Sequence, residues 1–143
     1  QTSLELGYPD AGAEREQLTG ADRRTLLAGT EPQMSAGQLL ELQHQVDSVH
    51  AADALLDYQQ ALLEFTRQSP RYQNGLSPRA GLGLLHSAKA WALLAGRDLV
   101  LPEDLQTVLP VVVGHRLQAA EDQTESLSGS ERVRVLLESV PLP

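Results

Sequence analysis

The chain has 143 residues, no cysteine and a formal net charge of −8 at pH 7. This length fits one domain with a single modest core, and the lack of cysteine excludes a disulfide framework or a thiolate metal site. The acidic charge disfavours a nucleic-acid or anionic membrane surface, and no apolar run approaches the roughly 20 residues that cross a bilayer.

The first third of the chain predicts helices that start at polar capping residues. Asp10 can cap a helix that weakens around Gly20. Ser35 and Gln38 stand in the capping-box relation and predict a second helix at about residues 36 to 47. The apolar residues of this second helix are Leu39, Leu40, Leu42 and Val46.

Two further helices are expected in the middle of the chain. The third helix carries an apolar stripe of Leu55, Leu56, Tyr58, Leu62, Leu63 and Phe65. A polar, turn-rich loop at residues 69 to 75 separates it from the fourth helix, which opens at Ser77 and Pro78 and ends at Gly96. The fourth helix is apolar on several sides, as in the centre of a bundle, and Trp91 has the spacing of a core residue.

The last third predicts a short extended stretch, a fifth helix and a final amphipathic segment. The fifth helix begins at Pro102, and we expect Pro110 to break or kink it because proline removes a backbone donor. Residues 121 to 130 are predicted to form a flexible link. The final segment carries Val133, Leu136, Leu137 and Val140. Helical periodicity almost from end to end predicts an all-α helical bundle of about five to six helices.

Most catalytic signatures are absent from the sequence. It contains no Gly-x-x-x-x-Gly-Lys-Ser/Thr phosphate loop, no His-Glu-x-x-His and no Gly-x-Ser-x-Gly. The four histidines are His44, His50, His86 and His115. Because their spacing matches no metal motif, each is interpreted as an ordinary surface or partly packed histidine, and we expect no metal ligands.

The motif Ser77-Pro78-Arg79 is the strongest candidate for chemistry. Ser77 fits the N-cap and Pro78 the first helical position. Arg79 then lies at the positive end of the helix dipole, which costs roughly 0.3–1 kcal/mol. A bound anion would reverse the sign of this interaction, so Arg79 is a candidate phosphate ligand. A solvated arginine, or one paired with a carboxylate of a neighbouring helix, is the other interpretation that these residues leave open.

Two glycines lie in the same predicted helix. Gly81 and Gly83 each lower the stability of the helix by about 1 kcal/mol relative to alanine. They could admit a ligand, or they could allow close contact with another helix. Contact between helices through small residues is the favoured explanation.

Seven short motifs occur in an order that carries a family resemblance. They are Leu6-Gly7-Tyr8-Pro9-Asp10, Glu14-Arg15-Glu16, Leu55-Leu56-Asp57-Tyr58, Thr66-Arg67, Ser77-Pro78-Arg79-Ala80, Gly96-Arg97-Asp98 with Pro102-Glu103-Asp104, and His115-Arg116-Leu117. Together, over about residues 4 to 140, they resemble the end of MoxR-type AAA+ ATPases. The segment from Thr19 to Met34 matches poorly, and glycine at 81 and 83 departs from the pattern.

The resemblance implies a helical lid that follows an α/β nucleotide-binding core. It places a hinge segment at residues 1–9, the lid bundle at 10–120, and a flexible link with the C-terminal helix of the same lid at 121–143. In that family the arginine of Ser-Pro-Arg is the second sensor of ATP. This role would fall on Arg79, with Ser77 and Pro78 forming the same nucleotide-binding turn.

The segment at residues 1–9 carries the weaker part of this implication. Gly7, Tyr8 and Pro9 would form the hinge between core and lid, and they would approach the adenine. The chain begins with Gln1 rather than methionine, and we expect it to be a fragment of a longer protein.

The implied activity of the intact protein is ATP hydrolysis with ATP and Mg, coupled to chaperone-like remodelling or assembly of protein complexes. Its implied partners are the upstream AAA+ core, further copies of itself in a homo-oligomeric ring with an expected size of six, and a protein with a von Willebrand factor A domain. We expect a cytoplasmic protein without nucleic-acid contacts or membrane insertion. The fragment alone should be inactive and hold no cofactor. The alternative is a freestanding helical interaction module that binds a partner helix in a groove, without nucleotide.

Overall fold

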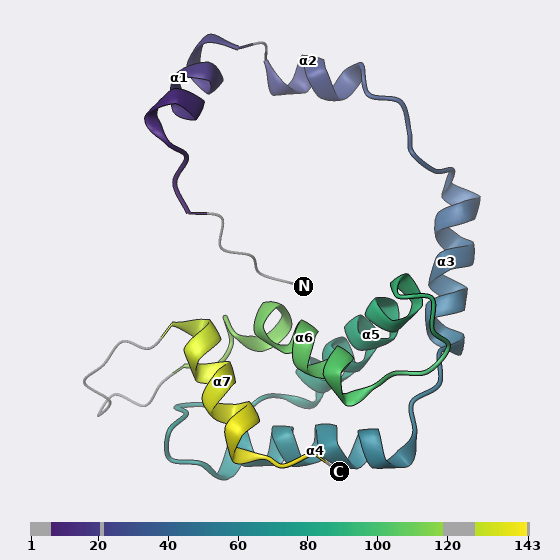
Figure 1. Cartoon of the computed structure of the whole chain (residues 1–143), viewed down its shortest axis with the longest axis vertical. Helices are drawn as coiled ribbons and strands as arrows, with labels where there is room; N and C mark the ends of the chain where they lie inside the picture. Colours follow the sequence, from purple (N-terminus) through teal and green to yellow (C-terminus); the bar gives the residue numbers. More distant parts are fainter. Residues whose placement is uncertain (1–6, 21, 119–127, 143) are drawn as a thin grey trace.

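The computed structural model describes residues 7–20, 22–118 and 128–142, and this part of the chain is all-helical (Figure 1). Its helices are α1 (Ala11–Thr19), α2 (Arg23–Ala28), α3 (Ala36–Ser48), α4 (Asp53–Gln68), α5 (Pro78–Leu94), α6 (Pro102–Val113) and α7 (Gly129–Ser139). The all-α prediction is confirmed. The described residues form seven helices where about five to six were expected, and the first predicted helix is divided near Gly20 into α1 and α2.

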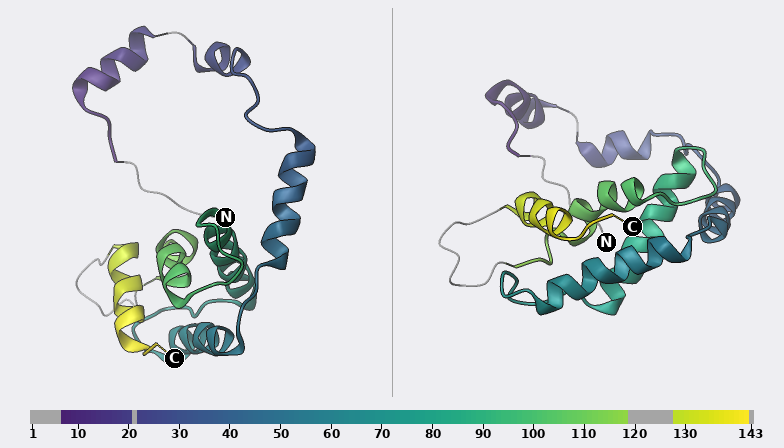
Figure 2. Two further views of the ribbon diagram at one scale, coloured as in Figure 1. Left: turned by 45° about the vertical axis from the view of Figure 1, so that its right-hand side comes forward. Right: turned by 60° about the horizontal axis from the view of Figure 1, so that its bottom comes forward.

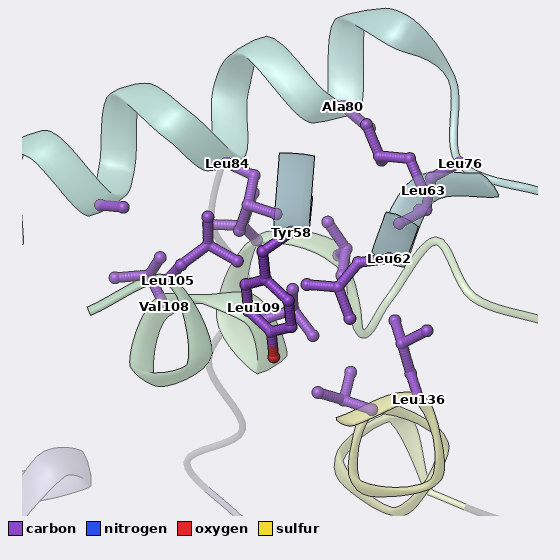
Figure 3. Packing of buried hydrophobic residues seen from close by; sticks show 14 of the residues in the cluster. Tyr58, Leu62, Leu63, Leu76, Ala80, Leu84, Leu105, Val108, Leu109 and Leu136 are labelled. Atoms are coloured by element: carbon purple, nitrogen blue, oxygen red, sulfur yellow. The ribbon is translucent and has the colours of Figure 1, made fainter. Parts of the chain in front are cut away.

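Four helices, α4 to α7, enclose the hydrophobic core. Leu62 of α4, Leu84 of α5, Leu105 and Leu109 of α6 and Leu136 of α7 have no exposed surface. Figure 3 shows these side chains converging around Tyr58 from the four helices. Burial of such large apolar side chains is the main stabilising term, at roughly 1.5–3 kcal/mol for each.

The N-terminal part of the chain, residues 7 to 45, forms an arm that arches away from these helices (Figure 1 and Figure 2). Neither α1 nor α2 packs against another described helix, and Val46 is the first buried residue among those whose burial the structure describes. The predicted apolar residues of α3 are therefore mostly exposed, including Leu39, Leu40 and Leu42. The caps at Asp10 and Ser35 form as expected, since they depend on local sequence alone.

The arm joins the packed helices through the end of α3. The backbone N–H of His50 donates to the Asp98 carbonyl at 2.7 Å, and Val100 N–H donates to the His50 carbonyl at 2.9 Å. These bonds form a parallel bridge between the α3–α4 and α5–α6 connections. The Lys89 ammonium on α5 also donates to the Asp47 carbonyl at 3.0 Å. The expected extended stretch at residues 99 to 101 thus serves to hold α3 in place.

Several sequence expectations need correction. Trp91 is not a core residue, because 46% of its surface is exposed. Pro110 does not break α6, which continues to Val113. Gly129 begins α7 under a Ser128 cap instead of belonging to a link. Residues 121 to 127 of the predicted link lie outside the described residues. The final apolar segment is confirmed as a packed helix face with Val133, Leu136 and Val140 buried.

Candidate functional site

The start of α5 is fixed by the helix before it. Leu76 is buried, and its backbone N–H donates to the Thr66 hydroxyl of α4 at 2.9 Å. Its carbonyl accepts a bond from Arg67 Nε, also at 2.9 Å. Because both backbone groups of Leu76 are satisfied by α4, the next residue, Ser77, enters α5 at a defined position.

The first turn of α5 has the cap that the sequence predicts. Ser77 Oγ accepts the backbone N–H of Ala80 at 3.2 Å, and Pro78 is the first helical residue. Arg79 follows, and its side chain is exposed. Within the described residues no carboxylate pairs with Arg79. The guanidinium therefore lies free at the positive end of the helix dipole.

An open cavity of about 640 Å³ lies beside this turn. Its lining comes from α5 and from the end of α6: Arg79, Leu82, Gly83, His86, Val112 and Arg116. This volume is in the range of small-molecule sites. Two guanidiniums and an imidazole supply its polar groups, and none of the lining residues is acidic.

The positive character of this lining contrasts with the chain as a whole, whose net charge is −8. Asp47 Oδ1 lies 3.8 Å from Nδ1 of the lining residue His86, and both side chains are exposed. Arg116 Nε donates to His115 Nε2 at 3.2 Å, which leaves the other nitrogens of its guanidinium available. Such an arrangement favours an anion with several oxygen acceptors.

The two glycines of α5 differ in their surroundings. A Cβ at Gly81 would lie 2.7 Å from Leu63 Cδ1 of α4, and the Gly81 carbonyl accepts a buried bond from Gln59 Nε2. Gly81 thus allows close packing of α4 and α5, as the sequence interpretation favours. A Cβ at Gly83 would meet nothing within 4 Å. Gly83 has no packing partner and lines the cavity.

The structure does not bring all the predicted site residues together. Ser77, Pro78 and Arg79 form one turn at the mouth of the cavity, whereas Gly7, Tyr8 and Pro9 belong to the arm (Figure 1). Tyr8 is fully exposed and therefore packs against none of the described helices. Their contact with adenine stays a prediction.

Two lining residues were missed by the sequence interpretation. His86 lies seven residues after Arg79, so helical spacing alone could have placed both on one face of α5. Arg116 was seen only as part of His115-Arg116-Leu117. Nothing in the local sequence links it to Arg79, because the packing of α5 on α6 creates their proximity.

Comparison with known proteins assigns this fold to a family. Residues 64–135, about half of the chain, match the model of the AAA lid domain, and this stretch contains Ser77-Pro78-Arg79 and Arg116. The chain belongs to the AAA lid domain family. The matched residues cover α5 and α6 entirely, so the cavity of the lid domain lies within the family match.

Curated relatives connect the lid domain with MoxR-family AAA+ ATPases. It is 32% identical to the uncharacterized protein YeaC of Bacillus subtilis, over 98% of the chain and 44% of that protein. It is also 32% identical to the chaperone MoxR1 of Mycobacterium tuberculosis, over 98% of the chain and 39% of that protein. The protein MoxR of Methylorubrum extorquens is 36% identical over half of the chain. The chain thus spans less than half the length of these relatives.

A crystal structure shows the same fold within a larger protein. The match is to a proposed ATPase from Cytophaga hutchinsonii, with a TM-score of 0.76 and 26% identity. It covers 99% of the lid-domain chain and 46% of the other chain. Because nearly the whole chain is matched, the arm also has a counterpart in that structure. None of the described helices is both long enough and apolar enough to cross a membrane.

Proposed function

We propose that the lid domain clamps ATP in a MoxR-type AAA+ ATPase and that Arg79 is its second sensor. The observation that carries the proposal is the guanidinium of Arg79, which pairs with no carboxylate among the described residues and lines a cavity that has no acidic lining residue. The family match, which includes Ser77-Pro78-Arg79, supports it. In this proposal Arg79 reaches from the lid to the phosphates of ATP held by a core domain.

The residues around the cavity suit phosphate oxygens better than other ligands. A guanidinium offers two parallel N–H donors to one phosphate. In this proposal Arg79 therefore serves as a clamp and sensor of the phosphates. Loss of the terminal phosphate would remove part of its partner and would allow the lid to rotate on the core.

The other parts of an ATPase site would come from outside this chain. The sequence has no phosphate loop, and within the described ranges no three His, Asp or Glu side chains gather to hold a metal ion. We assign the magnesium ligands and the phosphate loop to the upstream core. Gly7, Tyr8 and Pro9 would connect core and lid and approach the adenine, and Ser77 and Pro78 hold the turn that carries Arg79.

The wider context of the proposal follows the relatives. We propose a cytoplasmic protein that works as a homo-oligomeric ring, with six subunits as the expected size, and that remodels or assembles protein complexes. A protein with a von Willebrand factor A domain is the expected partner. Support comes from the relatives named chaperone MoxR1 and protein MoxR, which are more than twice as long as this chain.

The test is an Arg79→Ala substitution in the longest natural polypeptide that carries this lid domain. We expect kcat/KM for ATP to fall by at least about tenfold, since a charge-assisted contact to phosphate is lost, while the thermal unfolding temperature stays unchanged. Arg134→Ala is the matched control, because Arg134 is an exposed arginine on α7 outside the cavity. Unaltered ATPase kinetics and nucleotide affinity in Arg79→Ala would refute the assigned role.

A further inference from the structure

The cavity beside α5 contains a second arginine that has no assigned role. Arg116 comes from the chain just after α6, 37 positions beyond Arg79, yet both side chains line the same cavity. We propose that Arg116 is a second phosphate-binding residue, which acts with Arg79 on the triphosphate of the nucleotide. This inference rests on the proposed function and extends it to a residue that lies outside the Ser-Pro-Arg motif.

The position of Arg116 is held by the backbone around it. Its N–H donates to the Val113 carbonyl at 2.8 Å, and the next residue, Leu117, donates to the same carbonyl at 3.1 Å and is completely buried. These backbone bonds hold the turn that carries Arg116, and its side chain lines the cavity, as that of Val112 does. The backbone that carries Arg116 is thus held by hydrogen bonds, and the helix start that carries Arg79 is anchored to α4 through Leu76.

The guanidinium of Arg116 is available to a ligand. Among the described residues it has no carboxylate partner, and its one side-chain contact runs from Nε to His115 Nε2 at 3.2 Å. Its terminal nitrogens remain free to bind two oxygens of one phosphate. Two like charges that face one cavity without a counterion repel each other, and a polyanion between them removes this cost.

The charge of the lining indicates which ligand fits. With two guanidiniums and no carboxylate, the cavity favours a ligand that carries more than one phosphate group over a monophosphate. Each arginine can then pair with oxygens of a different phosphate. The structural alternative for Arg116 is a favourable interaction with the negative end of α6, and this role would affect stability without affecting the ligand.

The experiment measures binding, so that it does not depend on turnover. Dissociation constants for ATP, AMP and inorganic tripolyphosphate are determined by titration calorimetry at fixed ionic strength, with the longest natural polypeptide that carries the lid domain. The variants are Arg116→Gln, Arg116→Lys and Arg79→Gln. Arg134→Gln serves as the control, because it removes the same charge from an exposed site outside the cavity.

We expect Arg116→Gln to weaken binding of ATP and of tripolyphosphate by about tenfold. AMP affinity should change by less than about twofold, and Arg116→Lys should recover part of the loss because it retains the charge but not the planar pair of donors. Arg134→Gln should bind all three ligands as the wild type does. Weakening for ATP but not for tripolyphosphate would show contact with the nucleoside and would overturn the proposed phosphate role.

The variants separate this inference from the proposed function. If Arg79→Gln weakens ATP binding and Arg116→Gln does not, the second site is refuted and the role of Arg79 stands. If only Arg116→Gln weakens it, Arg116 is supported and the role of Arg79 is refuted. If neither does, both fail. If Arg116→Gln lowers the unfolding temperature but binds ATP as the wild type does, the only role of Arg116 is to stabilise the C-terminal end of α6. That result would refute the inference.

Discussion

The α5–α6 pair has two ends, and they use arginine in opposite ways. At the closed end, where the two helices are connected, the Arg97 guanidinium forms two hydrogen bonds with the carboxylate of Asp104. At the open end, Arg79 and Arg116 line a cavity and pair with no described carboxylate. Figure 1 shows the closed end next to the lower part of α3.

The two ends differ because the closed end contains a buried carboxylate and the open end contains a cavity. Asp104 is a buried carboxylate with 5% of its side chain exposed, and a buried charge without a partner is costly. Arg97 supplies that partner, and Asp104 also accepts the N–H of Leu101 at 2.8 Å to cap α6. Among the described residues, no such buried carboxylate lies at the open end. Arg79 and Arg116 form no ion pair with a described carboxylate, which is the pattern expected of a ligand site.

The largest change in the free energy of unfolding should come from removing the carboxylate of Asp104 at the closed end. We expect Asp104→Ala to lower the free energy of unfolding by about 2–4 kcal/mol, because it removes the cap of α6 and leaves Arg97 without its partner. Urea unfolding followed by circular dichroism measures this loss. Glu103→Ala is the control, since Glu103 lies in the same turn, is exposed and has no side-chain bond. Equal losses in the two variants would contradict a special role for Asp104.

The closed end should also respond to pH. Hydrogen bonds from Arg97, more than the bond from Leu101, hold the pKa of Asp104 below its usual range. A carboxylate with a lowered pKa in the folded state stabilises the protein above the unfolded value of about 3.9, and this contribution disappears as the pH falls through the folded pKa. The stability gap between wild type and Asp104→Asn should therefore be constant above about pH 5 and shrink below about pH 4.

This pH dependence is measured by urea unfolding of both proteins from pH 7 to pH 3. The pKa of Glu131 is lowered as well, by bonds from Ser128. Since Glu131 is present in both proteins, its contribution cancels in the difference. A gap that stays constant down to pH 3 would show that the Arg97–Asp104 pair contributes nothing that depends on ionisation.

The sequence predicts the ends of helices well because capping is local. Ser35 and Ser77 form the caps that their neighbours imply. The spacing of apolar side chains is a weaker guide to burial. It cannot distinguish a helix face that packs in the core from an apolar face that stays exposed in this chain. Leu39 and Leu40 have helical spacing and remain exposed on the arm, and Trp91 is half exposed on α5. Within the described residues, no apolar side chain of the arm is buried against another helix.

In the candidate site, too, local sequence predicts one residue, and only the packing of helices reveals the other. Arg79 could be predicted because its cost at a helix start is a local property of the sequence. Arg116 could not, since 37 positions and a helix-to-helix contact separate it from Arg79. The pairing of Arg97 with Asp104 was also missed, although both residues belong to quoted motifs. Tertiary packing, and not the motif, decides which arginine is paired and which is free.

The smallest change in the free energy of unfolding should appear at the open end, and it should be an increase where Asp104→Ala causes a decrease. Arg79 lies in the first turn of α5 without a counterion, and a cation there opposes the helix dipole. Without nucleotide, Arg79→Gln should therefore raise the free energy of unfolding by roughly 0.3–1 kcal/mol, although it removes a residue proposed to be essential for ATP. Urea unfolding in low salt measures the change, and high salt should reduce it because the dipole interaction is screened. A loss of stability would reveal a structural partner of Arg79 and would make the two ends of the α5–α6 pair alike.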